Sequence, residues 1–299
     1  RGLRKLLEKV YRKVAFDIVK EHGEEVFPEP SSEAETKPSP TSAKNESIQV
    51  TKQECAPMAV PPKVSVVINE EQLRDYLGPP IYHKDRMYTN TMPAGVALGL
   101  GYLGNGSGSL MPIETTLMPG KGNLHLTGKL GDVIKESASI ALSWVKSHAY
   151  ELGLTKEPGD TLLDHRDVHL HMPEGAIGKE GPSAGVAFAV SLISLLTDRS
   201  LPTKLAMTGE VSLRGMVLPV GGLKEKLLAA HRAGITTVIL PAHNRPSVEA
   251  DVPKSVLDDL EVHYVTNVWA ALDVAFGHGP WSAQARVWSS NETPEAASQ

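Results

Sequence analysis

Residues 167–196 read DVHLHMPEGAIGKEGPSAGVAFAVSLISLL, and this stretch decides the fold class. Its first six residues, Asp167–Met172, alternate polar and apolar, which predicts a strand. A glycine-rich segment follows, and a helix is predicted from about Ser183 to Leu196, before the turn residues Asp198-Arg199-Ser200. A strand, a glycine loop and a helix therefore place Ser183 where the loop ends and the helix begins.

The same mixture of strands and helices continues on both sides of this stretch. Strands are predicted over residues 64–68, 96–103, 110–118, 123–127, 205–213, 216–220, 237–240 and 261–265. Helices are predicted over residues 3–22, 70–76, 132–152, 222–233 and 267–276. Because some strands pair as hairpins, around 104–108 and around Arg214-Gly215, we expect an α+β fold with mixed sheets and packed helices.

Composition divides the chain into four segments. Residues 1–26 hold a helix with one apolar face, which must pack on something else. Residues 27–63 are rich in proline and in Ser, Thr, Glu and Lys, with too few apolar residues to offset chain entropy, so we expect a disordered linker or insert. Residues 64–277 have a globular pattern, and the polar tail 278–299 is expected to be flexible.

The overall composition excludes several classes of protein. The chain has 299 residues, of which 41% are hydrophobic and 22% charged, as in ordinary soluble globular proteins. A net charge of -5 gives no indication of nucleic-acid binding, and no apolar run reaches the ~18 residues of a membrane span. Cys55 is the single cysteine, which excludes an intrachain disulfide and a thiolate zinc cluster. The acidic residues in 1–26 argue against a transit peptide.

Ser183 has the features of a nucleophile. Gly181 and Gly185 let the backbone turn tightly and let a substrate approach closely. At a helix N-terminus, the backbone N–H groups of Ser183 and Ala184 can hold an oxyanion. The alternative is a simple N-cap serine. The sequence also fits G-x-S-x-G, but a nucleophile elbow follows its strand directly, and here about ten residues intervene.

Lys226 interrupts an apolar stripe. On the predicted helix 222–233, the inward positions i, i+3, i+4 and i+7 are Leu223, Lys226, Leu227 and Ala230. A desolvated lysine has a lowered pKa, as a general base near neutral pH requires. The alternative is a lysine whose stem covers apolar surface while its amine reaches water.

Other polar groups are candidates for a supporting role. Thr208 can hydrogen-bond the Lys226 amine, or be an ordinary strand threonine. His169 and His171 share a strand face and are predicted to line or support the cleft. As zinc ligands they would need a third ligand, for which only His165 or His125 is available, so we predict no metal site.

Five stretches resemble a known family. They are LTGKLGDVIKES (126–137), HLHMPEGA (169–176), GPSAG (181–185), AMTGEV (206–211) and LPVGGLKEK (218–226). Together, residues 78–276 resemble the proteolytic domain of Lon, the ATP-dependent Ser–Lys proteases. The resemblance implies that Ser183 is the nucleophile, Lys226 the catalytic lysine and Thr208 the residue that supports this lysine.

The resemblance also implies a context for the domain. It implies an upstream AAA+ module that uses ATP and magnesium, a homo-hexameric ring, and unfolded or damaged proteins as substrates, with no cofactor in the proteolytic domain itself. Residues 1–26 resemble the end of the AAA+ helical lid. Where the family has an aspartate linked to switching of the serine loop, this chain has Glu180. Residues 86–88 resemble mitochondrial members and 175–177 peroxisomal ones, and we expect the mitochondrial matrix, with the peroxisomal matrix as the alternative.

Two other functions remain open at this stage. An esterase-like hydrolase would use Ser183 with His263 and either Asp258 or Asp259. A binding module would hold a phosphate at the N-terminus of the helix that begins near Ser183.

Overall fold

The computed structural model describes residues 2–26, 64–79, 87–88, 90–103, 106–174 and 177–284. The chain divides into two compact units, Arg1–His83 and Lys84–Gln299. The predicted linker 27–63 and residues 285–299 of the predicted tail lie outside the described residues. Among the described residues, no helix is both long enough and apolar enough to span a bilayer.

The first unit contains helices α1 (Gly2–Val26) and α2 (Leu73–Leu77). The ammonium groups of Lys9 and Lys13 donate to the carbonyls of Leu77 and Asp75, at 3.1 and 3.0 Å, and so attach α1 to the end of α2. The prediction of a strand at residues 64–68 is wrong: the segment forms no strand and has no strand partner among the described residues. An apolar, β-branched sequence favours a strand only where a neighbouring strand can pair with it.

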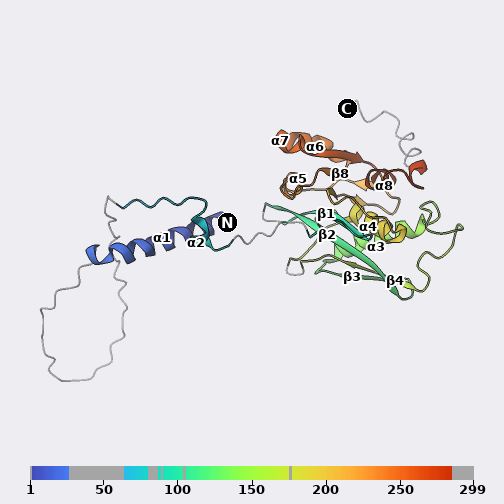
Figure 1. The fold of residues 1–299 in the computed structure, drawn as a ribbon. Coiled ribbons are helices and arrows are strands. Elements are labelled where there is room, and N and C mark those ends of the chain that lie inside the picture. The colour runs from blue at the N-terminus through green and yellow to red at the C-terminus, as the bar shows by residue number, and fades with distance from the viewer. Residues whose placement is uncertain are drawn as a thin grey trace, which may run out of the picture. The chain divides into compact units, whose positions relative to one another are not determined.

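The second unit is built on a seven-stranded sheet. Its strands are β1 (Val96–Tyr102), β2 (Gly108–Pro119), β3 (Leu124–Thr127), β4 (Arg166–His171), β5 (Leu205–Met207), β8 (Thr237–Pro241) and β9 (Glu261–Val265). Their order is β3-β4-β2-β1-β5-β8-β9, and Figure 1 shows β3 and β4 at one end of the sheet and β8 beyond β1. Strands β6 (Glu210–Val211) and β7 (Val217–Leu218) form a separate antiparallel pair.

The sheet is mixed, as predicted. The β1–β2 and β2–β4 pairs are antiparallel, whereas β3–β4, β1–β5, β5–β8 and β8–β9 are parallel. The expected α+β class with hairpins and packed helices is therefore confirmed.

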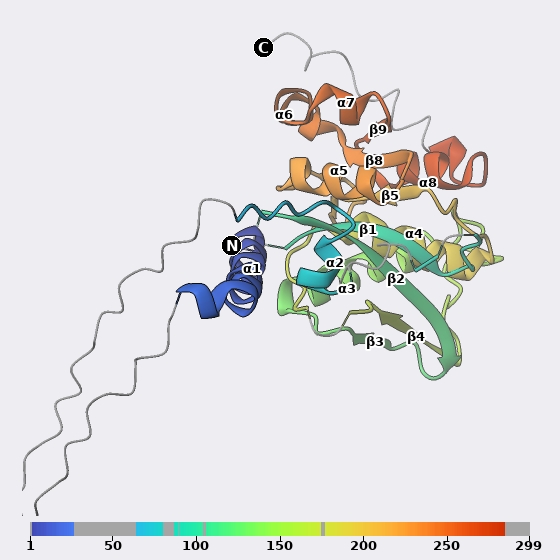
Figure 2. The ribbon, with the colours of Figure 1, turned by 60° about the vertical axis from the view of Figure 1, so that its left-hand side comes forward.

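Helices pack on this sheet and on each other. They are α3 (Asp132–Ser147), α4 (Gly185–Thr197), α5 (Leu223–Arg232), α6 (Arg245–Asp251), α7 (Lys254–Leu257) and α8 (Val268–Phe276), with a 3₁₀ turn, η1, at Ala242–Asn244. Both α4 and α5 contact β1 and β2, α3 and α8 pack against α4, and α6 and α7 contact α5. Figure 2 shows α6 and α7 with β9 at the end of the sheet opposite to β3 and β4.

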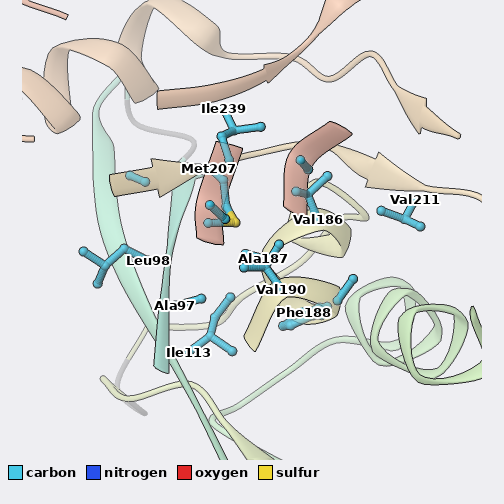
Figure 3. Close-up of a cluster of buried hydrophobic side chains, with 14 of the residues drawn as sticks. Ala97, Leu98, Ile113, Val186, Ala187, Phe188, Val190, Met207, Val211 and Ile239 are labelled. Atoms are coloured by element: carbon cyan, nitrogen blue, oxygen red, sulfur yellow. The ribbon is translucent and has the colours of Figure 1, made fainter. Parts of the chain in front are cut away.

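Helix α4 is the centre of the core. Its residues Gly185–Ser194 are all buried, because the sequence from Gly185 is apolar on every side of the helix. Figure 3 shows α4 side chains such as Ala187 and Val190 in one cluster with Ile113 of β2 and Met207 of β5. Since Ser183 lies two residues before the first residue of this helix, the packed core restricts the position of the serine segment.

Two predictions for the region after α4 need correction. The predicted strand 205–213 is broken at Thr208-Gly209, so β5 lies in the large sheet and β6 in the small one. Gly209 has φ +158°, and a Cβ there would lie 2.8 Å from Val186, so the break brings the backbone close to α4. Helices α6 and α7 were not predicted, because they have only 7 and 4 residues and give little periodicity.

Candidate active site

A cavity of about 550 Å³ opens between β1, the segment before α4 and the start of α5. Its wall includes residues 99–103, 178–184 and 219–222, together with Glu210 and Lys226. We call residues 177–184 the serine loop. Ser183 and Lys226, which the sequence singles out independently, therefore border the same space.

The N-cap interpretation of Ser183 is wrong. Helix α4 begins at Gly185 with Ala184 as its N-cap, so Ser183 lies one residue outside the capping position. The Ser183 side chain is half-buried on the cavity wall, and its hydroxyl forms no hydrogen bond with the part of the chain that the structure describes. A hydroxyl on a cavity wall without a structural bond is available for chemistry.

The backbone around Ser183 is held from two sides. The Ser183 carbonyl accepts from the N–H of Gly209 at 2.8 Å and from the Thr208 hydroxyl at 3.1 Å. The Pro182 carbonyl accepts from Ser137 Oγ of α3 at 3.2 Å. A Cβ on Gly185 would lie 2.7 Å from the Val211 nitrogen, so the close approach of α4 and β6 requires glycine there.

Two backbone N–H groups at this position have no partner within the residues that the structure describes. The N–H groups of Ser183 and Ala184 donate to no acceptor within the described residues, whereas those of Gly185 and Val186 bind the carbonyls of Pro182 and Gly209. Free N–H groups beside a hydroxyl are the donors that an oxyanion needs.

Lys226 is buried in the cavity wall. Its side chain is on the apolar face of α5 with Leu223, Leu227 and Ala230, and only 2% of the residue is exposed. Burial lowers the pKa of Lys226 from 10.5 to about 8, because desolvation disfavours the charged amine. The stripe argument therefore correctly identified a desolvated lysine, and the alternative of an amine that reaches water is wrong.

Thr208 orients the Lys226 amine. Thr208 is fully buried at the break between β5 and β6, and Lys226 Nζ donates to its Oγ1 at 3.1 Å. The single hydroxyl proton of Thr208 goes to the Ser183 carbonyl, so this hydroxyl can only accept from the amine. A relay of two hydrogen bonds thus connects the amine of Lys226 to the backbone of Ser183.

Sequence reasoning missed a second buried lysine, Lys179. Only 5% of this residue is exposed, although it also borders the cavity. Its ammonium group donates to the carbonyls of Gly128, Glu174 and Ile177, at 3.1, 3.0 and 3.3 Å. A lysine in a glycine-rich loop has no periodic pattern around it, so only its three-dimensional contacts identify it as buried.

Glu180 caps a helix. Its Oε1 accepts from the N–H of Val133, in the first turn of α3, at 3.1 Å and from the N–H of Gly181 at 3.2 Å. A carboxylate at a helix N-terminus is favoured by the unpaired N–H groups and by the helix dipole. Gly131 leaves room for the carboxylate, because a Cβ there would lie 1.4 Å from Glu180 Oε2.

The two histidines of β4 are not among the residues that line the cavity. Instead, His169 Nε2 and His171 Nδ1 both contact the Thr127 hydroxyl of β3, at 2.9 and 2.7 Å. Their contacts therefore give no direct support to a role in the cleft.

His125, a candidate third zinc ligand, lies beside His169, with ring centroids 6.3 Å apart, but both candidate third ligands contact carboxylates. His125 contacts Asp167 at 2.9 Å, which holds the pKa of that carboxyl well below its usual range, and His165 pairs with Asp164. Within the described residues, no three His, Cys, Asp or Glu side chains are arranged to hold a metal ion.

The esterase-like triad is not assembled. His263 is on β9 and contacts Glu261 at 3.0 Å, and Asp259 contacts His231 at 2.8 Å. Neither His263 nor Asp258 nor Asp259 lines the cavity with Ser183.

The cavity therefore combines an alcohol, a desolvated amine and unpaired N–H groups. A neutral amine can accept the proton of an alcohol that attacks a carbonyl carbon, and N–H groups can hold the oxyanion that forms. The arrangement suits acyl transfer, in which an amide or ester is cleaved through a covalent intermediate.

Comparison with protein families gives one match that covers most of the second unit. The model described as "Lon protease (S16) C-terminal proteolytic domain" matches residues 67–278.

Curated proteins give matches of the same kind. "Lon protease homolog 2, peroxisomal" of Xenopus laevis is 42% identical over 284 residues, which is 93% of this chain and 32% of the relative. The protein of the same name from Mus musculus is 45% identical over 238 residues, which is 79% of this chain and 27% of the relative. The protein of that name from Oryza sativa subsp. indica is 47% identical over 214 residues, which is 72% of this chain and 24% of the relative. The chain thus spans a quarter to a third of the length of these relatives.

Proposed function

Because the chain belongs to the Lon protease (S16) family, whose C-terminal proteolytic domain it contains, we propose that it cleaves peptide bonds with Ser183 as nucleophile and Lys226 as general base. The observation that carries the proposal is the buried Lys226 amine, which donates to Thr208 alone among the described residues and borders the same cavity as Ser183.

Lys226 is a better base than Lys179. A pKa of about 8 leaves a useful fraction of the Lys226 amine neutral at slightly alkaline pH. One of its N–H bonds goes to Thr208, and its lone pair is not taken by any hydrogen bond within the described residues. Burial also lowers the pKa of Lys179, but its three carbonyl acceptors bind the charged form and leave no lone pair for catalysis.

The proposed reaction has two steps. The Ser183 hydroxyl attacks the peptide carbonyl carbon, Lys226 Nζ takes the proton, and the N–H groups of Ser183 and Ala184 bind the oxyanion, each contributing ~3 kcal/mol. The C–N bond breaks when the Lys226 ammonium gives its proton to the leaving amine, which leaves an acyl group on Ser183. Water then loses a proton to Lys226 and attacks the ester carbonyl. The bond from this carbon to Ser183 Oγ breaks as Lys226 returns the proton to Oγ, which releases the acid and restores the free enzyme.

The larger context is proposed by analogy with the family. We infer that an AAA+ module, with ATP and magnesium, unfolds damaged proteins and feeds them to this cavity in a homo-hexamer. We further propose that residues 1–26 end the AAA+ lid, that 27–63 are a linker or insert and that 64–277 are the proteolytic domain. The expectation of a flexible tail from residue 278 is wrong at its start, because Trp281 is buried and its Nε1 donates to the Gly277 carbonyl at 3.0 Å.

The names of the relatives support a proposal for the organelle. The three relatives described above bear a peroxisomal name, which favours the peroxisomal matrix over the mitochondrial matrix that residues 86–88 led us to expect. Fractionation of cells that express the full-length protein tests this: co-sedimentation with a mitochondrial matrix marker would contradict it.

Substitution of the two proposed catalytic residues tests the function. Ser183→Ala and Lys226→Met should each reduce cleavage of an unstructured fluorogenic peptide to background, and a serine-directed fluorophosphonate should label the wild type but not Ser183→Ala. His263→Ala is the control, since an esterase-like triad requires this histidine and the Ser–Lys mechanism does not. Turnover at the wild-type level in either catalytic variant would refute the dyad.

A further inference from the structure

We propose that Lys179 is a positioning residue for this reaction, because its ammonium group gathers three carbonyls and thereby fixes the loop that presents Ser183. The inference rests on the proposed function, since positioning matters only if Ser183 is the nucleophile. It assigns to Lys179 a role that differs from that of the base, Lys226.

The ammonium group of Lys179 is saturated. It has three N–H donors, and three carbonyl oxygens lie within hydrogen-bond distance, those of Gly128, Glu174 and Ile177. A buried ammonium ion costs free energy unless it is fully hydrogen-bonded, and 95% of this residue is removed from solvent. The match between donors and acceptors indicates a site that selects a protonated lysine and not only a long side chain.

Two of these three carbonyls lie in or next to a residue with a left-handed backbone conformation. Glu174 has φ +65° and Lys129 has φ +56°, a left-handed conformation that costs a residue other than glycine ~1–3 kcal/mol. The Glu174 carbonyl is itself bound by the ammonium group, and the Gly128 carbonyl belongs to the peptide bond that precedes Lys129. Such conformations persist only where surrounding contacts impose them, and the ammonium group supplies such a contact for both.

Lys179 also joins the serine loop to the segment after β3 through its backbone. Its N–H donates to the Lys129 carbonyl at 3.1 Å, and its carbonyl accepts from the Gly131 N–H at 2.9 Å. From this anchor the chain reaches Ser183 in four residues, one of which, Gly181, has φ +99° and imposes little direction of its own. Without the ammonium group, the anchor loses its three side-chain bonds, and the loop keeps the contacts of Glu180, Pro182 and Ser183 alone, so the Ser183 hydroxyl shifts relative to Lys226 within the range that these contacts allow.

A small shift of this kind has a large kinetic effect. Misplacement of a reacting group by ~1 Å can cost ~100-fold in rate. Because Lys179 holds the loop and gives none of its donors to the reacting atoms in this mechanism, its loss should reduce the rate of the chemical step and leave peptide binding nearly unchanged.

The test is Lys179→Met in the 299-residue chain, with Lys204→Met as the matched control at an exposed lysine. We expect Lys179→Met to lower kcat for the unstructured peptide about 10- to 100-fold, with KM changed less than about twofold. Fluorophosphonate labelling of Ser183 should slow by a similar factor, and Lys204→Met should match the wild type in all three. Lys179→Arg keeps the charge but presents a planar fork that does not converge on the three carbonyls, so it should show the same pattern in milder form.

Wild-type kcat and labelling rate in folded Lys179→Met would overturn the inference, as would a rise in KM at constant kcat. If Lys179→Met does not fold, by circular dichroism, folded Lys179→Arg decides in the same way: a lowered kcat at constant KM supports the role, and an unchanged kcat excludes it. Ser183→Ala separates the two proposals. If it is active, the proposed function fails; if it is inactive while both Lys179 variants are fully active, only the positioning role fails.

Discussion

Replacement of Lys226 by methionine should stabilise the protein while it abolishes activity. Burial lowers the pKa of this lysine from 10.5 to about 8. At ~1.4 kcal/mol per unit of pKa shift, the cost of keeping the buried amine charged lowers the free energy of unfolding by ~3 kcal/mol at neutral pH. Methionine has nearly the same length and no charge. The substitution also removes the hydrogen bond to Thr208, worth ~1 kcal/mol. The net gain in the free energy of unfolding should be ~2 kcal/mol.

The pH dependence of this gain distinguishes a charge effect from better packing. Below pH 8 both the folded and the unfolded wild type bind the lysine proton, so the full cost is present. Between pH 8 and 10.5 the folded state has released this proton while the unfolded state still binds it, so wild-type stability rises with pH. The advantage of Lys226→Met should therefore be greatest below pH 8 and should disappear by about pH 10.5, apart from the lost hydrogen bond.

Urea unfolding, followed by the fluorescence of the buried Trp144, Trp269 and Trp281, measures this at pH 7 and at pH 10. Lys224→Met is the matched control, because it makes the same change at an exposed position of the same helix and should alter stability little. A Lys226→Met variant that is less stable than the wild type at pH 7, or more stable by the same amount at both pH values, would refute the reasoning.

Two further perturbations follow from the site and the core. Thr208→Val removes the acceptor that favours the charged form of the Lys226 amine. The acidic limb of the kcat/KM profile, near pH 8 in the wild type, should therefore move to lower pH by up to about one unit, while the plateau falls about 10-fold. A pH profile that matches that of Thr116→Val, a control at an exposed threonine, would contradict this. Gly215→Ala should lower the free energy of unfolding by ~2–4 kcal/mol in urea titrations, because Gly215 has φ +81° and a Cβ would lie 2.3 Å from Trp144 Nε1. Gly159 has φ +93° and open space around it, so Gly159→Ala measures only the cost of an alanine at a positive φ. An equal loss of stability in the two variants would exclude a contribution from the clash between the added Cβ and Trp144.

The sequence singled out Ser183 and Lys226 as candidates through local chemistry. A lysine at an i+3 position of an apolar stripe lies on the inward face of its helix, and the structure of α5 shows that the whole side chain is buried there. In the same way, alternation fixes which residues form β4, and the apolar run after Gly185 forms α4, because period and polarity depend only on near neighbours.

Tertiary structure alone decided the rest. The break between β5 and β6 at Thr208-Gly209 exists because their backbone N–H groups bind the carbonyls of Ile239 and Ser183, which are remote in sequence. The surroundings of Lys179 likewise depend on Gly128, which lies beyond a strand and a helix. Residues 64–68 are mostly β-branched but pair with no strand in the part of the chain that the structure describes. The order of residues along the chain encodes periodicity, whereas hydrogen bonds between distant segments form only after the core has packed, so their partners appear only in the folded molecule.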